Sequence, residues 1–276
     1  MKIYARALVG VALCALFPSM AAAQGGKLVF STFGFPPFSY SEGDQVKGPF
    51  ADIVDAICKE IRYECKYEFM PNRRSKMTLE NGTVNGNFPL GWNKERDKWL
   101  WFTIPLMKTE YGFFARADSQ LTYRTLEDLQ GLTIGVFGPS NTSNALEQIQ
   151  RKVKAEGLKP IQIEMHPNAD GTGMKKVAAG RYPLYYVNKD VGVREMAEAN
   201  VSNVKYIGKE RELLYFVAFA KKHNDKRIVD KFNRAAIKLA NEGAVAKLLA
   251  RYGIDPGQWD EGTLKKYNIV LGPATD

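Results

Sequence analysis

The stretch 125-TLEDLQGLTIGVFGPSNTSNALEQIQRKVKAEG-157 decides the fold of this chain. It contains, in order, a capped turn, a short β-branched strand, a turn with Gly and Pro, and a long helix. The same order of strand, Gly/Pro-bearing loop and helix occurs earlier, from the strand "KLVFST" at Lys27 to the helix "FADIVDAICKEIR" at Phe50. This repetition predicts two α/β lobes.

Two apolar stretches enclose the second unit. The stretch "YGFFARA" (111–117) precedes it, and "LLYFVAFA" (213–220) follows it. We expect both to be strands that cross between the lobes, which makes the first lobe discontinuous. Lobe 1 is expected to comprise residues 24–113 and 215–276, with lobe 2 at 114–214. Each lobe is expected to hold a mixed sheet flanked by helices.

Apolar stripes at helical spacing support this arrangement. The helix that follows the first loop carries five such residues on one face. The chain becomes helical again after the second crossing, where two further stripes occur. The residues of the three stripes are Ile53, Val54, Ile57, Cys58 and Ile61, then Phe232, Ala236, Leu239 and Ala240, and finally Val245, Leu248 and Leu249.

The N-terminus has the pattern of a signal peptide, which we assign to residues 1–23. Lys2 and Arg6 form a basic region, "ALVGVALCALF" is an apolar stretch too short to span a bilayer, and small residues follow at 21–23. Cleavage is expected before Gln24. An exported protein is therefore expected.

Composition restricts the function further. Lysine and arginine give a formal net charge of +9, but they are scattered among acids along helical stretches such as "KKHNDKRIVDKFNRAAIK". Such scattering indicates a solvated face and not a nucleic-acid-binding stripe. We therefore expect no nucleic-acid partner.

Export also changes the meaning of Cys58 and Cys65, because thiols in an oxidising compartment can pair and stay paired. A disulfide is expected, and two free structural thiols are the alternative. A zinc site would require more cysteine or histidine ligands nearby. We expect no metal and no cofactor.

Several motifs occur in a fixed order along the mature chain. They are "GFPPFSY" at Gly34, "GPFADIVDAI" at Gly48, "AICKEIRYECKYEF" at Ala56, "NKERDKWLWFTIPL" at Asn93 and "TLEDLQGLTIGV" at Thr125. In this order they resemble the motifs of family 3 solute-binding proteins of polar amino-acid ABC importers, and the two cysteines match the spacing of the basic-amino-acid branch. No single motif is as specific as the ordered set.

The resemblance implies a type II periplasmic binding protein fold and a function. We expect a monomeric periplasmic protein that binds a small polar carboxylate solute, an amino acid or a related acid, between two closing lobes. It would deliver this solute to an ABC importer permease in the inner membrane.

The resemblance also assigns roles in lobe 1. Arg96 would bind the ligand carboxylate through two hydrogen bonds, since guanidinium offers two parallel donors to two oxygens. The alternative is that Arg96 pairs with a surface carboxylate of the protein. Phe35 would stack on the ligand, or pack in the core instead. The backbone N–H of Gly91 would meet the carboxylate, and Asn93 replaces the usual threonine.

Other lobe 1 positions depart from the pattern of basic-amino-acid binders. Thr32 stands where they place an acid, and Asn72 where they place an apolar or aromatic residue. Arg73 and Arg74 add positive charge near the expected site. These changes point away from lysine, arginine or histidine as ligands.

In lobe 2, Ser140, Asn141 and Thr142 precede a helix whose free N–H groups favour an anion. The alternative role of Ser140 or Thr142 is helix capping. Asn188 replaces the aspartate that holds the ligand ammonium in the family, and Asp190 is a possible substitute for it. A carboxylated ligand without an amino group therefore remains open.

Two other classes of function are kept as alternatives. A sensor or accessory protein could use the same scaffold to signal to a membrane partner. A dehydratase-like enzyme is the third class, but His166 and His223 lie in no recognisable motif, and the sequence shows no nucleophile elbow. We expect no enzymatic activity.

Overall fold

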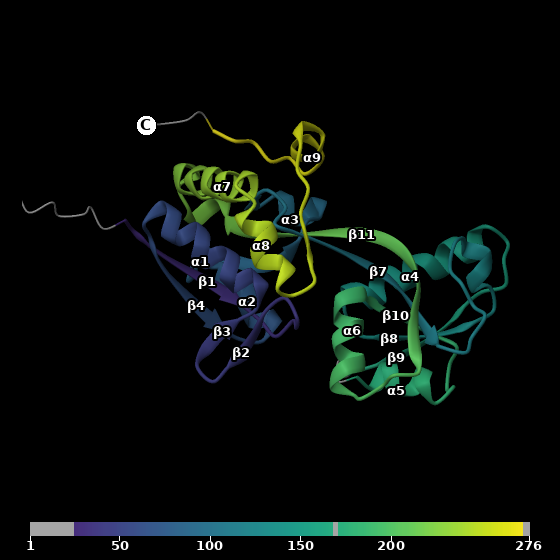
Figure 1. The fold of residues 1–276 in the computed structure, drawn as a ribbon. Helices are drawn as coiled ribbons and strands as arrows, with labels where there is room; N and C mark the ends of the chain where they lie inside the picture. The colour runs from purple at the N-terminus through teal and green to yellow at the C-terminus, as the bar shows by residue number, and fades with distance from the viewer. Residues whose placement is uncertain (1–24, 168–170, 273–276) are drawn as a thin grey trace, which may run out of the picture.

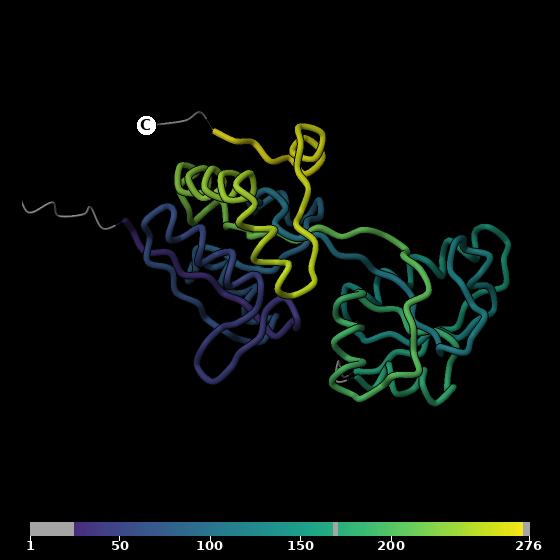
Figure 2. Tube along the Cα trace, viewed as in Figure 1, coloured from purple at the N-terminus to yellow at the C-terminus, as the bar shows by residue number. Residues whose placement is uncertain are grey.

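The computed structural model describes residues 25–167 and 171–272, so the predicted signal peptide at residues 1–23 lies outside the described residues. Two α/β lobes lie side by side, and two long strands run between them (Figures 1 and 2). These strands are β7 (Met107–Arg116) and β11 (Val204–Ala220). They include the two stretches predicted to cross between the lobes.

Lobe 1 contains the N-terminal elements and the C-terminal helices. Its elements are β1 (Lys27–Thr32), β2 (Tyr40–Glu42), β3 (Gln45–Lys47), α1 (Pro49–Ile61), β4 (Glu64–Phe69), α2 (Asn72–Glu80), β5 (Gly86–Gly91), α3 (Lys94–Asp97), β6 (Leu100–Phe102), η2 (Lys221–His223), α7 (Lys226–Asn241), α8 (Ala244–Ala250), β12 (Asp255–Pro256) and α9 (Glu261–Lys266).

Lobe 2 is formed by the chain between the two crossing strands. Its elements are η1 (Leu126–Leu129), β8 (Thr133–Phe137), α4 (Asn141–Ala155), β9 (Gln162–His166), α5 (Thr172–Ala178), β10 (Leu184–Asn188) and α6 (Lys189–Glu198). The predicted lobe boundaries at 113/114 and 214/215 fall inside β7 and β11 and stay a prediction.

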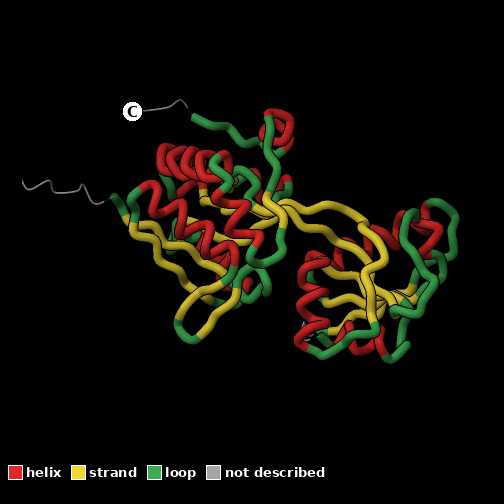
Figure 3. Tube along the Cα trace, viewed as in Figure 1, coloured by secondary structure: helices red, strands yellow, loops and turns green. Residues whose placement is uncertain are grey.

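The sheets of the two lobes are continuous through the crossing strands, with the strand order β4-β1-β5-β11-β7-β10-β8-β9. Neighbouring strands at the outer ends, such as β1 with β4 and β8 with β9, run parallel. The crossing strands are antiparallel to each other and to their neighbours β5 and β10. The sheet is therefore mixed, as predicted, and helices cover it in both lobes (Figure 3).

Each lobe has two apolar cores, one on each side of its part of the sheet. In lobe 1, α1, α7 and α8 cover one side, where Phe30, Ile57 and Phe232 are buried; the predicted stripes of these helices point into this core. On the other side, Phe102 of β6 and Phe216 of β11 are buried, and Leu264 of α9 packs against this cluster. In lobe 2, α4 covers one side and α5 and α6 cover the other.

Three elements differ from the sequence-based expectation. The loop after β1 contains a hairpin, β2–β3, whose turn places Gly43 at φ +57, a conformation that glycine adopts without strain. Strand β11 begins at Val204, before the apolar stretch, because its charged first half pairs with β7 as a ribbon. Helix α6 was not predicted, since Gly192 and its alternating charges hide a weak apolar stripe.

The predicted disulfide between Cys58 and Cys65 is confirmed. It joins the last turn of α1 to the start of β4, with a Cα–Cα distance of 6.2 Å and a sequence separation of 7. The bond holds the tight turn in which Arg62 takes a left-handed conformation at φ 59.

We expect the double substitution Cys58→Ala/Cys65→Ala to lower the free energy of unfolding by about 2–3 kcal/mol, because it frees a short loop in the unfolded chain. Urea titration of the oxidised protein and the variant measures this difference. An unchanged unfolding midpoint would contradict it. The substitution lies outside the site described below, so solute binding should not change.

Candidate ligand-binding site

Arg96 is positioned by a short capped helix at the end of strand β5. The side chain of Asn93 accepts the backbone N–H of Arg96 at 2.8 Å and so caps α3. The guanidinium Nη1 of Arg96 then donates to the carbonyl oxygen of Gly91 at 2.6 Å. The side chain is half-buried and turned back toward the lobe.

The aromatic run after Arg96 supports this arrangement. Leu100, Phe102 and Ile104 are buried, and β6 pairs with the lobe 1 half of β11. The hydroxyl of Thr103 accepts the backbone N–H of Val217 at 3.1 Å. This run therefore packs into lobe 1 and supports the segment that carries Arg96.

Two tyrosines on the crossing strands lie next to Arg96. Tyr111 comes from β7 and Tyr215 from β11, and both are buried. Burial lowers the pKa of Arg96, and the neighbouring Tyr111 and Tyr215 oppose this effect. Within residues 25–167 and 171–272, no carboxylate pairs with Arg96. The site therefore holds a half-buried guanidinium whose nearest partners are neutral groups.

Burial also raises the pKa of both tyrosines, and that of Tyr215 lies well above its usual value. Both phenols stay protonated at neutral pH and keep their O–H donors. Tyr111 also lies against Arg211, whose guanidinium is 5.8 Å from the ring centroid.

Phe35 reaches the same region from the loop after β1. Its ring meets the ring of Tyr215 edge-on, with centroids 5.8 Å apart, and it also packs against Phe33 and Phe38. The residue is half-buried. These ring contacts show the packing role that was the alternative for Phe35, and its contact with the ligand stays a prediction.

Lobe 2 approaches the site through the start of α4. Thr142 lies near the hydroxyl of Tyr111 and opposes the rise that burial causes in the pKa of that tyrosine, which places the start of α4 close to the crossing strand β7. Ser140 caps α4 by accepting the backbone N–H groups of Thr142 and Ser143, each at 3.1 Å. Asn141 is exposed. The capping role expected as an alternative for Ser140 is therefore present.

Asn188 lies at the end of β10 and is buried at 2% exposure. Its Oδ1 accepts the backbone N–H groups of Asp190 and Val191 at 3.0 and 3.2 Å, so it caps α6. Its Nδ2 donates to the hydroxyl of Thr109 at 3.0 Å, and that hydroxyl donates to Asp190 at 2.5 Å.

Asn72 and Arg73 are not joined to this cluster by hydrogen bonds. Both are exposed at the start of α2, and neither makes a hydrogen bond to Arg96 or to the crossing-strand tyrosines. Thr32, at the position where an acid was expected, is fully buried and donates to the carbonyl of Phe88 at 2.7 Å.

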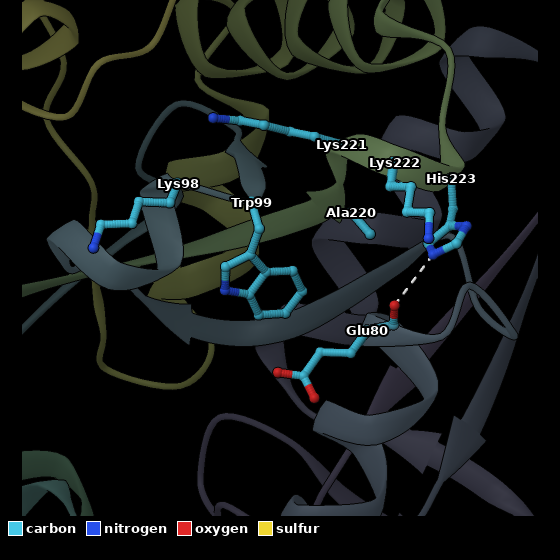
Figure 4. Close-up of a pocket in the computed structure, with 7 residues that line it drawn as sticks. All are labelled: Glu80, Lys98, Trp99, Ala220, Lys221, Lys222 and His223. Atoms are coloured by element: carbon cyan, nitrogen blue, oxygen red, sulfur yellow. Dashed lines mark hydrogen bonds between the residues drawn. The ribbon is translucent and has the colours of Figure 1, made fainter.

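A cavity in lobe 1 lies away from these residues. It has a volume of about 590 Å³ and is lined by Glu80, Lys98, Trp99, Ala220, Lys221, Lys222 and His223. In Figure 4 the side chains of Lys98 and Lys221 point away from Lys222 and His223. Arg96 does not line this cavity, so the convergence of residues at the crossing strands defines the candidate site.

Sequence analysis missed the two tyrosines. Both stretches were assigned as apolar crossing strands, in which a tyrosine reads as one more buried aromatic residue. Their position could have identified them, because Tyr111 and Tyr215 each lie on a strand that passes between the lobes.

The two histidines, which the enzyme alternative would require, are not gathered at this site. His166 stacks on Tyr185 in lobe 2, whereas His223 lies in lobe 1 and contacts the carbonyl of Glu80 at 3.1 Å. In the part of the chain that the structure describes, no three His, Cys, Asp or Glu side chains form a group that could hold a metal ion. Nor does any described helix combine the length and hydrophobicity needed to cross a bilayer.

Comparison with known proteins agrees with this architecture. Arginine-binding extracellular protein ArtP of Bacillus subtilis (strain 168) is 24% identical over 259 residues, which is 89% of this chain and 94% of ArtP.

Two solved structures are similar in fold. One, from work on glutathione import via GshT and the cystine ABC importer TcyBC of Streptococcus mutans, has a TM-score of 0.71 and 18% identity, and covers 86% of this chain and 98% of its own. A histidine kinase sensor domain with similarity to periplasmic binding proteins has a TM-score of 0.68 and 18% identity, and covers 83% and 97%. The expected type II periplasmic binding protein fold is confirmed.

The family of bacterial extracellular solute-binding proteins, family 3, matches residues 29–255 of this chain. This match covers nearly all of both lobes and the two strands between them. The chain belongs to the bacterial extracellular solute-binding proteins, family 3.

Proposed function

We propose that this protein binds a small carboxylate solute at the junction of its two lobes and delivers it to the permease of an ABC importer. Arg96 would hold the carboxylate, with the backbone of Gly91 beside it and Phe35 against the body of the solute. Thr142 and Asn141 would approach from lobe 2, and closure would bend the two crossing strands.

One observation carries this proposal. Arg96 is half-buried at the junction of the lobes, and no described carboxylate neutralises it. Burial of an unpaired cation is unfavourable, so such a group is typical of a site that an anionic ligand completes. A planar guanidinium matches the two oxygens of a carboxylate in particular.

Isothermal titration calorimetry of the refolded, ligand-free protein with a library of small carboxylates tests the proposal. We expect at least one acid to bind with a Kd in the micromolar range or below, about −8 kcal/mol or better. The amide of the same acid should bind far more weakly, because it lacks the charge that Arg96 requires. Absence of binding across the library, or equal binding of acid and amide, would contradict the proposal.

The remaining expectations follow from this function. We propose a periplasmic location after removal of residues 1–23, a monomeric state and no catalytic activity. Asn72 and Arg73 are exposed near the start of α2, and we propose that they contact the solute only after the lobes close.

A sensory role on the same fold is the second candidate function. The fold of a histidine kinase sensor domain is shared with this chain, so the fold itself is compatible with either role. Stimulation of an importer ATPase by the loaded protein would favour transport. Ligand-dependent binding to a membrane kinase without such stimulation would favour signalling.

A further inference from the structure

Asn188 stands where the family resemblance implies an aspartate partner for a ligand ammonium, and its side-chain oxygen is already engaged. Its oxygen accepts two backbone N–H groups of α6. Its amide nitrogen donates to the hydroxyl of Thr109 at 3.0 Å. The side-chain oxygen is the one acceptor of Asn188, and with two N–H groups bound to it, no lone pair is left for a ligand ammonium.

The groups around Arg96 are neutral. Tyr111 and Tyr215 are buried phenols that keep their protons at neutral pH, and the carbonyl oxygen of Gly91 lies 2.6 Å from the Arg96 guanidinium. The phenol O–H groups can donate to carboxylate, keto or hydroxyl oxygens on a ligand. An ammonium group would find only neutral acceptors here, because no carboxylate of the described residues pairs with Arg96 or stands beside it.

Asp190 is the carboxylate that comes closest to this cluster. It accepts the hydroxyl of Thr109 at 2.5 Å, and burial raises its pKa. The other charged groups around it are Glu110, Asp255 and Lys189, of which Glu110 pairs with Lys189 and Asp255 with Lys108. We therefore assign Asp190 to the network that links α6 to β7.

We infer that the ligand carries no ammonium group beside the carboxylate that Arg96 binds, and that its second polar group is an acceptor. The class is that of small hydroxy, keto or dicarboxylic acids. Asn188 is then a positioning residue, which holds Thr109 and the start of α6 in place. The inference rests on the proposed function and names its substrate class.

Matched pairs that differ only in this group test the inference on the wild-type protein. Calorimetry would compare alanine with lactate, aspartate with malate, and glutamate with 2-hydroxyglutarate. For the pair that binds best, we expect the hydroxy acid to bind at least about tenfold more tightly, because neutral acceptors do not fully compensate a buried ammonium for its lost hydration. Tighter binding of the amino acid would overturn the inference and leave the proposed function standing. Absence of binding by any carboxylate would overturn both.

Two variants separate Asn188 from Asp190. Asn188→Asp keeps the oxygen that caps α6 and supplies a negative charge, so we expect it to shift the preference toward the amino acid by about tenfold or more. Asp190→Asn keeps an acceptor for Thr109, and we expect the preference for the hydroxy acid to persist. An amino acid that binds wild type and loses affinity about tenfold or more in Asp190→Asn would identify Asp190 as its ammonium partner and overturn the inference. Thermal unfolding confirms that each variant is folded.

Discussion

Replacing Arg96 with alanine is expected to raise the Kd for the solute by about 100-fold or more. The substitution removes two charge-assisted hydrogen bonds, each contributing about 1.5–3 kcal/mol, and about 1.4 kcal/mol corresponds to a tenfold change in affinity. Because the side chain of Arg96 makes one hydrogen bond among the described residues, to the Gly91 carbonyl, the fold should tolerate its loss. Calorimetry with the acid that binds best to wild type measures the change.

Two further variants make this result specific. Arg96→Lys keeps the charge but not the forked geometry, so we expect it to retain part of the binding energy. Arg227→Ala removes an arginine with 82% side-chain exposure that pairs with Asp225, and it should bind as wild type does. Wild-type affinity in Arg96→Ala would show that the solute binds elsewhere.

Phe30→Ala is expected to lower the free energy of unfolding by about 3–5 kcal/mol. Phe30 lies on β1 at 0% exposure, in the centre of the lobe 1 core. Its ring centroid is 5.6 Å from that of Phe219 and 5.8 Å from that of Phe232, so truncation leaves a cavity between the sheet and α7. Urea titration followed by tryptophan fluorescence measures the loss.

Phe69→Ala is the matched control, since this phenylalanine lies at the end of β4 with 41% exposure. We expect it to change the free energy of unfolding by less than about 1 kcal/mol. The four tryptophans, Trp92, Trp99, Trp101 and Trp259, all lie in lobe 1, so the fluorescence change reports this lobe. Equal losses in the two variants would contradict the account of the core.

Much of the fold could be predicted because its signals are local. The strand "KLVFST" became β1 with the predicted bounds, and the stripe of Ile53, Val54, Ile57 and Ile61 became the buried face of α1. The disulfide followed from export and two nearby cysteines. Each of these features depends on residues that are close in the sequence.

The features that sequence analysis missed depend on contacts between distant segments. Tyr111 and Tyr215 meet only because β7 and β11 pair along most of their length. The engagement of Asn188 depends on Thr109, 79 positions away, whose hydroxyl faces the end of β10. Arg96 itself was predicted from a motif, but the motif does not show which groups surround its guanidinium.

A crystal structure of the protein with the acid that binds best tests the central claim most directly. The account predicts that the ligand carboxylate lies within hydrogen-bonding distance of the Arg96 guanidinium, about 2.7–2.9 Å, between the lobes and beside Tyr111 and Tyr215. A ligand bound elsewhere, or an Arg96 side chain turned to solvent with the ligand in place, would contradict the account.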